Sequence, residues 1–144
     1  YVCEHDPHPN VDLLLRKWKD HEPEEPSYGI ISLGAFEHFA KIDEDKVQAY
    51  RNFFRKVHDF LKPGGRLSLQ MMGYGDVPRE RRHSDLFIAR EVFPEWDRPY
   101  LGYIGRACEL QFGVGLGRSD RHDSVNLLRA WLQNVHPRLL QARP

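Results

Sequence analysis

The chain has 144 residues, with 21 basic and 21 acidic side chains and a formal net charge of zero. This length is enough for one domain with a modest core. The neutral balance gives no electrostatic reason to expect binding to nucleic acid or to an anionic membrane surface. No apolar run approaches the ~20 residues of a membrane span, and the first residues lack a secretory signal pattern. We therefore expect a cytoplasmic protein without an integral membrane segment.

The first part of the chain predicts two helices that flank one strand. Asn10 is an N-cap candidate for a helix over residues 11–20, which has apolar residues at helical spacing. An acidic connector leads to a strand over residues 28–33. Asp43 is the expected cap of a longer amphipathic helix that we expect to end near Lys62, where a Pro-Gly-Gly sequence follows.

The second part alternates strands, loops and helices. It predicts, in order, a strand over 66–72, a loop over 73–83, a short helix over 84–92, a loop over 93–99, a helix over 101–108, a glycine-rich strand over 110–116 and a final helix over 121–135. Strands that alternate with helices and are continuously apolar predict an α/β fold with a mostly parallel sheet. Two cysteines, Cys3 and Cys108, are too few for a disulfide framework or a metal site, so no metal is expected.

The most informative segment runs from Ile30 to Phe39 with the sequence I-I-S-L-G-A-F-E-H-F. An apolar run that ends in glycine predicts a buried strand of a parallel sheet. Ligands of such sheets bind at the carboxyl ends of the strands, which is where Glu37 and His38 follow. The later sequence L-K-P-G-G-R-L-S-L-Q, which ends at Gln70, predicts a tight turn and a second strand.

These two segments and the sequence D-R-H-D-S-V-N-L-L-R-A-W over residues 120–131 resemble one enzyme family. It comprises the S-adenosylmethionine (SAM)-dependent methyltransferases related to cyclopropane-fatty-acid and mycolic-acid synthases. The family's motifs are S-I-G-x-F-E-H, then L-x-P-G-G-R-h-h-L-H-T-I, and near the end D-R-x-x-Y-A-x-T-L-x-x-W. The resemblance implies a Rossmann-like class I methyltransferase sheet and SAM as the cofactor.

Two family features have no counterpart in this chain. One is the glycine-rich loop after the first strand, whose glycines let the backbone approach the cofactor. The other is the acidic residue after the second strand. The alternate glycines Gly113, Gly115 and Gly117 predict a strand edge or bulge. Residues 1–144 therefore resemble the C-terminal part of a single methyltransferase-like domain that lacks its N-terminal strands, as the first residue, which is not methionine, also suggests.

The resemblance assigns three candidate catalytic residues. Glu37 matches a family glutamate that helps to hold a bicarbonate ion acting as general base; a carboxylate here can order a base or stabilise a developing cation. The structural alternative is a carboxylate that caps the next turn. His38 is either a proton relay or structural. Gln70 stands where the family has histidine, and glutamine donates and accepts hydrogen bonds but takes no proton at neutral pH.

Cofactor and substrate contacts are also implied. Trp18 matches a tryptophan that packs against the adenine in the family, with Lys19 beside it, and Gly34 completes the predicted cofactor site; the alternative places Trp18 in the core. The predicted substrate contacts are Tyr74, Met72, which stands where the family has isoleucine, and Ser124, which stands where it has tyrosine. A basic cluster at residues 79–83 is either solvated or a contact for an anionic head group.

Of the family's bicarbonate-site residues, only Glu37 is identical. We therefore expect methyl transfer to carbon or oxygen of a lipid-like or secondary-metabolite substrate rather than cyclopropanation, with alignment of the reactants supplying much of the rate. Two alternatives stay open: a non-catalytic methyltransferase-like module, and a cofactor-independent cyclase or isomerase that uses Glu37 as base. Because an uncovered central strand promotes association, we expect a homo-oligomer or completion of the sheet by further residues.

Overall fold

The computed structural model describes residues 10–41, 43–74, 91–92 and 97–141 of the chain. Cys3, the basic cluster at residues 79–83 and all but the end of the helix predicted over 84–92 lie outside these ranges. The chain divides into two compact units, residues 1–113 and residues 114–144, and each is described by itself.

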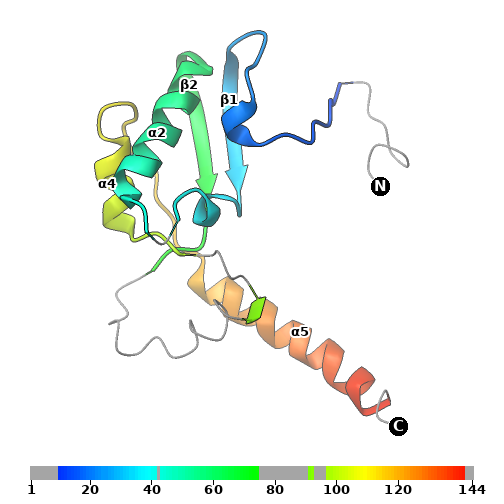
Figure 1. Ribbon diagram of the computed structural model, residues 1–144. Helices are drawn as coiled ribbons and strands as arrows, with labels where there is room; N and C mark the ends of the chain where they lie inside the picture. The colour runs from blue at the N-terminus through cyan, green and yellow to red at the C-terminus, as the bar shows by residue number, and fades with distance from the viewer. Residues whose placement is uncertain (1–9, 42, 75–90, 93–96, 142–144) are drawn as a thin grey trace. The chain divides into compact units, whose positions relative to one another are not determined.

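The first unit is built on two parallel strands, β1 (Ser27–Leu33) and β2 (Leu61–Gln70), which lie side by side (Figure 1). Ile30 is opposite Leu67 in the register, and Leu33 is opposite Gln70. The α/β class, the first strand and its parallel partner are confirmed. The second strand starts five residues earlier than predicted because Leu61 already pairs with Ser27, whose backbone N–H donates to the carbonyl of Phe60 (2.8 Å).

The helix α2 (Lys46–Asp59) covers one face of this sheet (Figure 1). Its cap is Asp45, whose side chain accepts a hydrogen bond from the backbone N–H of Gln48 (3.1 Å), two residues after the predicted cap. The helix ends at Asp59 because the chain is needed for pairing from Leu61 onward. Its buried residues pack against inward-facing side chains of both strands: Tyr50, Phe53, Phe54 and Val57 on the helix, and Ile30, Leu67 and Leu69 on the strands.

An aromatic cluster forms the centre of the core. Phe36, in the short 3-10 helix η2 (Phe36–His38), is fully buried and stacks on Tyr50 with 4.4 Å between ring centroids. It also meets Phe53 edge to face at 5.4 Å. Such contacts add to the free energy gained by burying the rings, by roughly 0.5–1.5 kcal/mol a pair. The cluster therefore holds η2, which includes Glu37, at the end of β1.

A second helix, α4 (Leu101–Cys108), packs on α2 and matches its predicted bounds. Ile104, Ala107 and Cys108 are its buried residues. The Arg51 guanidinium of α2 donates to the carbonyl of Arg106 (3.4 Å), which ties the two helices together. Burial raises the pKa of the Cys108 thiol, so this cysteine is less reactive than an exposed one.

The helix predicted over residues 11–20 is wrong. In the described part of this segment there is only a 3-10 turn, η1 (Trp18–Asp20), and Leu13, Leu14 and Leu15 are exposed. A short helix is marginal in water without a surface to pack on. The structure describes no such surface beside these leucines.

The glycine-rich strand predicted over residues 110–116 is also wrong. The backbone N–H groups of Gln111 and Phe112 both donate to the carbonyl of Cys108 (2.9 Å each), so this segment begins as a turn that continues from α4. Among the described residues β1 and β2 are the only paired strands, and a glycine-rich segment without a neighbouring strand gains nothing to offset its backbone entropy.

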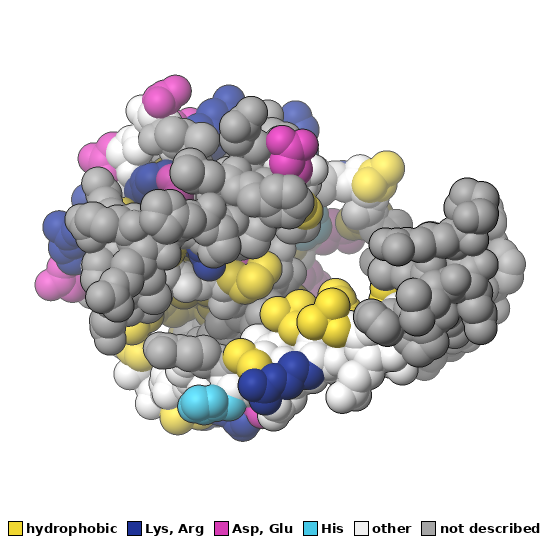
Figure 2. Space-filling view, turned by 90° about the horizontal axis from the view of Figure 1, so that it is seen from below, with side chains coloured by type: hydrophobic (Ala, Val, Ile, Leu, Met, Phe, Trp, Pro, Cys, Tyr) yellow, Lys and Arg dark blue, Asp and Glu magenta, His cyan; other side chains and the backbone are white. Residues whose placement is uncertain are grey.

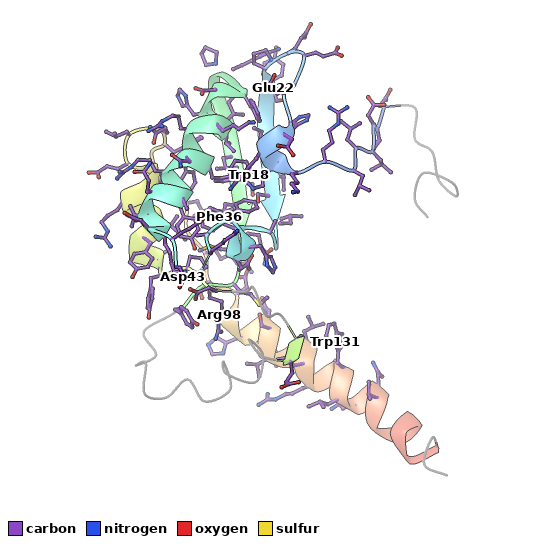
Figure 3. All side chains as sticks on the ribbon, viewed as in Figure 1. Trp18, Glu22, Phe36, Asp43, Arg98 and Trp131 are labelled. Carbon is purple, nitrogen blue, oxygen red and sulfur yellow. The ribbon has the colours of Figure 1, made fainter. Side chains whose placement is uncertain are left out.

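The second unit contains α5 (Arg121–Gln141). The helix begins where predicted and ends six residues later than predicted, beyond Pro137. A proline inside a helix removes one hydrogen bond and kinks or weakens the helix without always ending it. Trp131 lies on α5 (Figure 3) and is exposed.

Candidate functional site

The turn after β1 depends on Gly34. Its φ of +59° is in the left-handed region that favours glycine, and its backbone N–H donates to the carbonyl of Gln70 at the end of β2 (3.1 Å). This bond joins the carboxyl ends of the two strands. The chain then turns directly into η2, which brings Glu37 beside the end of β2.

Glu37 is the one charged side chain that is buried among the described residues, with 1% of its surface exposed. Its Oε1 accepts a hydrogen bond from the backbone N–H of Met72, two residues beyond β2. Its Oε2 is buried and has no hydrogen-bond partner among the described residues. The structural interpretation, a carboxylate that bonds nearby backbone, therefore accounts for one oxygen and leaves the second available.

The charge of Glu37 acts on Tyr50, a buried residue of α2. Burial, followed by the charges of Asp97 and Glu37, raises the pKa of Tyr50 to about 12, and Tyr103 adds a smaller effect. Asp97 is paired with Lys46 at the start of α2. The surroundings of Glu37 are thus screened from water and contain a hydroxyl that remains protonated at neutral pH.

An aromatic wall continues beyond the end of β2. The Tyr74 N–H donates to the carbonyl of Pro99 (2.9 Å), and its ring lies 5.1 Å from that of Tyr100. The Arg98 guanidinium, labelled in Figure 3, is 4.5 Å from the Tyr74 ring centroid. Tyr100 in turn meets Tyr103 at 5.2 Å. These side chains form a half-buried surface of rings that follows the end of β2.

Trp18 occupies a separate position, on the other side of the aromatic cluster. It points into the space between β1 and α2 (Figure 3), where its ring is 5.1 Å from Phe39 and meets Phe53 edge-on at 5.3 Å. The same ring lines an open groove of about 530 Å³. Trp18 therefore belongs to the core and also faces a groove. The other residues that line the groove are Lys19, Phe39, Glu44, Asp45, Gln48, Ala49, Asn52 and Lys56.

The structure brings four of the predicted site residues to one edge of the sheet: Gly34, Glu37, Gln70 and Met72. The side chains of Gln70 and Met72 are exposed, and so is that of His38. Lys19 lines the groove, with its Nζ 5.6 Å from the Trp18 ring centroid.

Ser124 lies in the second unit, in the first turn of α5, where its hydroxyl donates to the carbonyl of Asp120 (3.4 Å). A serine hydroxyl that bonds a carbonyl in the preceding turn is a common local arrangement. The predicted roles of Ser124 and of the other site residues stay predictions.

Sequence reasoning missed Tyr50 and Asp97, whose charge acts on the Tyr50 hydroxyl. Tyr50 has the spacing of an ordinary core position on α2, and Asp97 lies in the loop predicted over 93–99, so neither carries a local signal of function. A tyrosine in the apolar stripe of an amphipathic helix is the only hint that the sequence offers, because its hydroxyl needs a partner once buried.

Two further findings concern what the described residues contain. No helix among them is both long and apolar enough to cross a membrane. Within the same ranges, no group of three or more His, Cys, Asp or Glu side chains is arranged to hold a metal ion.

Comparison with known proteins identifies the family of the chain. The sequence model of the family described as mycolic acid cyclopropane synthetase matches residues 2–143. Cyclopropane mycolic acid synthase 2 of Mycobacterium leprae (strain TN) is 32% identical over 134 residues, which cover 83% of this chain and 42% of that protein. The chain thus spans less than half the length of this curated relative, and no solved structure matches it. The chain belongs to the mycolic acid cyclopropane synthetase family.

Proposed function

We propose that this chain is part of a SAM-dependent one-carbon transferase that methylates carbon or oxygen of a lipid-like or secondary-metabolite substrate. The observation that carries the proposal is Glu37, a buried carboxylate at the carboxyl end of a parallel strand with one oxygen still available. Membership of a family related to a cyclopropane mycolic acid synthase supports the reaction class. The same relation supports a Rossmann-like sheet in which β1 and β2 are neighbouring strands.

The groove at Trp18 fits the adenosine part of SAM. It offers an aromatic ring and, on its rim, two amide side chains, Gln48 and Asn52, which are hydrogen-bonded to each other (3.0 Å). A base needs an aromatic or apolar surface together with donors and acceptors at its edge, and the groove supplies both. When bound, SAM supplies an electrophilic methyl group on a sulfonium ion.

The chain's own residues would then position the substrate and accept a proton. Glu37 is oriented by the Met72 N–H and can accept a proton or order another base. The rings of Tyr74 and Tyr100 can exclude water from the reacting groups. Gln70 can orient a polar substrate group but cannot take up a proton at neutral pH, which favours plain methylation over cyclopropanation.

A second function is supported by specific residues of the sequence. Glutamine at position 70 and serine at position 124 replace two side chains of the family pattern. A methyltransferase-like module that binds a partner without catalysis would tolerate these changes. A third proposal is a cofactor-independent cyclase or isomerase that uses Glu37 as base. Two results together would support it: the chain binds no SAM, and Glu37→Gln abolishes turnover.

Calorimetric titration with S-adenosylhomocysteine tests the cofactor role. We expect micromolar binding by the folded chain, and a roughly 2- to 10-fold weaker Kd for Asn52→Ala, which removes a hydrogen-bonding group from the groove. Arg55→Ala is the matched control, because Arg55 is an exposed residue of α2 outside the groove.

Circular dichroism in the same buffer must show that each variant is folded. A folded chain that fails to bind the ligand contradicts the cofactor role of this chain and favours the non-catalytic module. If the Asn52→Ala and Arg55→Ala variants both bind the ligand as tightly as the wild type, the groove is not the cofactor site.

A further inference from the structure

Two buried polar atoms in the core of the first unit have no hydrogen-bond partner among the described residues. They are Oε2 of Glu37 and the hydroxyl oxygen of Tyr50. Both side chains are almost wholly buried, at 1% and 0% exposure. A buried polar atom without a partner is costly, so native proteins almost always pair such atoms with each other or with an ordered water.

Two observations place these two side chains near each other. Phe36, the residue immediately before Glu37, stacks on the Tyr50 ring at 4.4 Å and an angle of 26°. The charge of Glu37 acts on the Tyr50 hydroxyl strongly enough to be one of the causes of its raised pKa. The two atoms thus lie in one water-excluded region, between η2 and α2.

Their chemistry is complementary. An ionised carboxylate only accepts hydrogen bonds, whereas a phenol donates one and remains protonated up to its own pKa. The other groups that face Tyr50 are Asp97, which is paired with Lys46, and Tyr103. The charges of Glu37 and Asp97 both disfavour the ionised form of Tyr50. The Tyr50 hydroxyl therefore stays a neutral donor, which suits a water bound to the free oxygen of Glu37.

We propose that Tyr50 is a positioning residue for Glu37, and that one ordered water bridges the Tyr50 hydroxyl and the second oxygen of Glu37. With Oε1 fixed by the Met72 N–H, the carboxylate would then be held at both oxygens and its orientation would be set from the core. The pairing itself does not depend on a cofactor, whereas its value for catalysis rests on the proposed function.

Titration of Tyr50 in the full chain tests the pairing. Tyrosine labelled with ¹³C at Cζ reports ionisation by NMR, and the Tyr50 signal is assigned by its loss in Tyr50→Phe. We expect Glu37→Gln to lower the pKa of Tyr50 from about 12 toward the ordinary value of 10, since the neighbouring charge is removed. Glu44→Gln is the matched control, because Glu44 is an exposed carboxylate that does not face Tyr50.

A crystal structure of the same chain tests the geometry. One water within hydrogen-bond distance of both oxygens supports the proposal. A different partner for Glu37 Oε2, such as the guanidinium of Arg98, overturns it, as does a Tyr50 pKa that is the same in Glu37→Gln and wild type. S-adenosylhomocysteine binding is measured separately, so failure of the pairing and failure of the cofactor role are told apart.

Discussion

At the scale of single residues, Glu37 combines a structural and a chemical role. Its Oε1 satisfies the Met72 N–H, which would otherwise lack a partner where the chain leaves β2. The same side chain carries a charge into a buried position, which proteins do at a cost and often at functional sites. A variant that keeps an oxygen at this place but removes the charge can therefore distinguish the effect on stability from the effect on activity.

Glu37→Ala removes the acceptor and leaves the part-buried Met72 N–H unpaired, so we expect a loss of about 1–3 kcal/mol in the free energy of unfolding. Glu37→Gln keeps a carbonyl oxygen at the same place and should lose clearly less, while turnover falls by about 10²–10⁴-fold if Glu37 is the base. Urea unfolding of both variants measures the first effect. Equal losses of stability would show that the Met72 contact contributes little.

Tyr50 predicts how stability depends on alkaline pH. Its pKa is raised to about 12 in the folded chain against 10 in the unfolded chain. The stabilisation is fully present below pH 10 and is lost as the pH rises from 10 through 12, because only the unfolded chain ionises there. A shift of this size corresponds to about 2–3 kcal/mol at most.

The check is the urea midpoint as a function of pH, measured for the wild type and for Tyr50→Phe. Other tyrosines and the lysines also titrate in this range, so the difference between the two curves isolates Tyr50. We expect the wild type to lose more stability than Tyr50→Phe between pH 10 and 12, the range between the two pKa values. Parallel curves would contradict a buried, protonated hydroxyl.

At the scale of elements, two glycines have opposite roles. A Cβ on Gly65, in β2, would lie 2.8 Å from the backbone carbonyl oxygen of Lys62, which cannot move away as a flexible side chain would. Gly102, in α4, has no atom within 4 Å of its Cβ position. The first glycine is required by close approach, whereas the second only lowers the helix propensity of α4.

We therefore expect Gly65→Ala to lower the free energy of unfolding by roughly 1–3 kcal/mol through overpacking. Gly102→Ala should raise it by about 0.5–1 kcal/mol, since alanine restricts the unfolded chain and is favoured in helices. Denaturant unfolding of the two variants side by side measures both. A stabilised Gly65→Ala variant would mean that the turn before the paired part of β2 can relax.

The predicted elements show which patterns were sufficient. The apolar stripe of α2 was found because its period matches a buried surface, made by Phe36, Phe53 and their neighbours. The run in β1 was found as a strand, but the prediction that it is buried is wrong for one face, since Ile31 and Leu33 are exposed. The leucines at 13–15 have the same kind of pattern but remain exposed, so the period alone overpredicted a helix. The strand predicted over residues 110–116 is wrong for a related reason, since a strand needs a neighbouring strand, which no local pattern reveals.

At the scale of the whole molecule, apolar side chains remain uncovered in both units. Ile31 and Leu33 of β1 are exposed, and so are Leu128 and Leu132 of α5. Figure 2 shows hydrophobic side chains open on the surface that it draws. Successive residues of a strand face opposite sides, so Ile31 and Leu33 lie on the face away from α2. Exposed apolar surface favours association, and so does the edge of β1 that has no paired strand among the described residues.

We expect the chain of residues 1–144 to associate, with a mass by light scattering that rises with concentration. The double variant Ile31→Thr and Leu33→Thr should reduce this association, because threonine keeps strand propensity while removing apolar surface. Ser68→Thr is the control on the neighbouring strand, where Ser68 is paired with Ile31 and no apolar side chain is lost. A wild-type chain that stays monomeric at every concentration contradicts the expectation.

The amino-acid sequence by itself determined the α/β class, the parallel pair of strands, the apolar face of α2 and the position of Glu37 after β1. These follow from local periods, caps and motifs, which act over a few residues. Only the tertiary structure decided which backbone group the Glu37 carboxylate bonds, that Trp18 packs on Phe39 and Phe53, and that Glu37 and Asp97 both act on Tyr50. These relations depend on how strands and helices pack, and packing is a property of the whole fold that no single segment encodes.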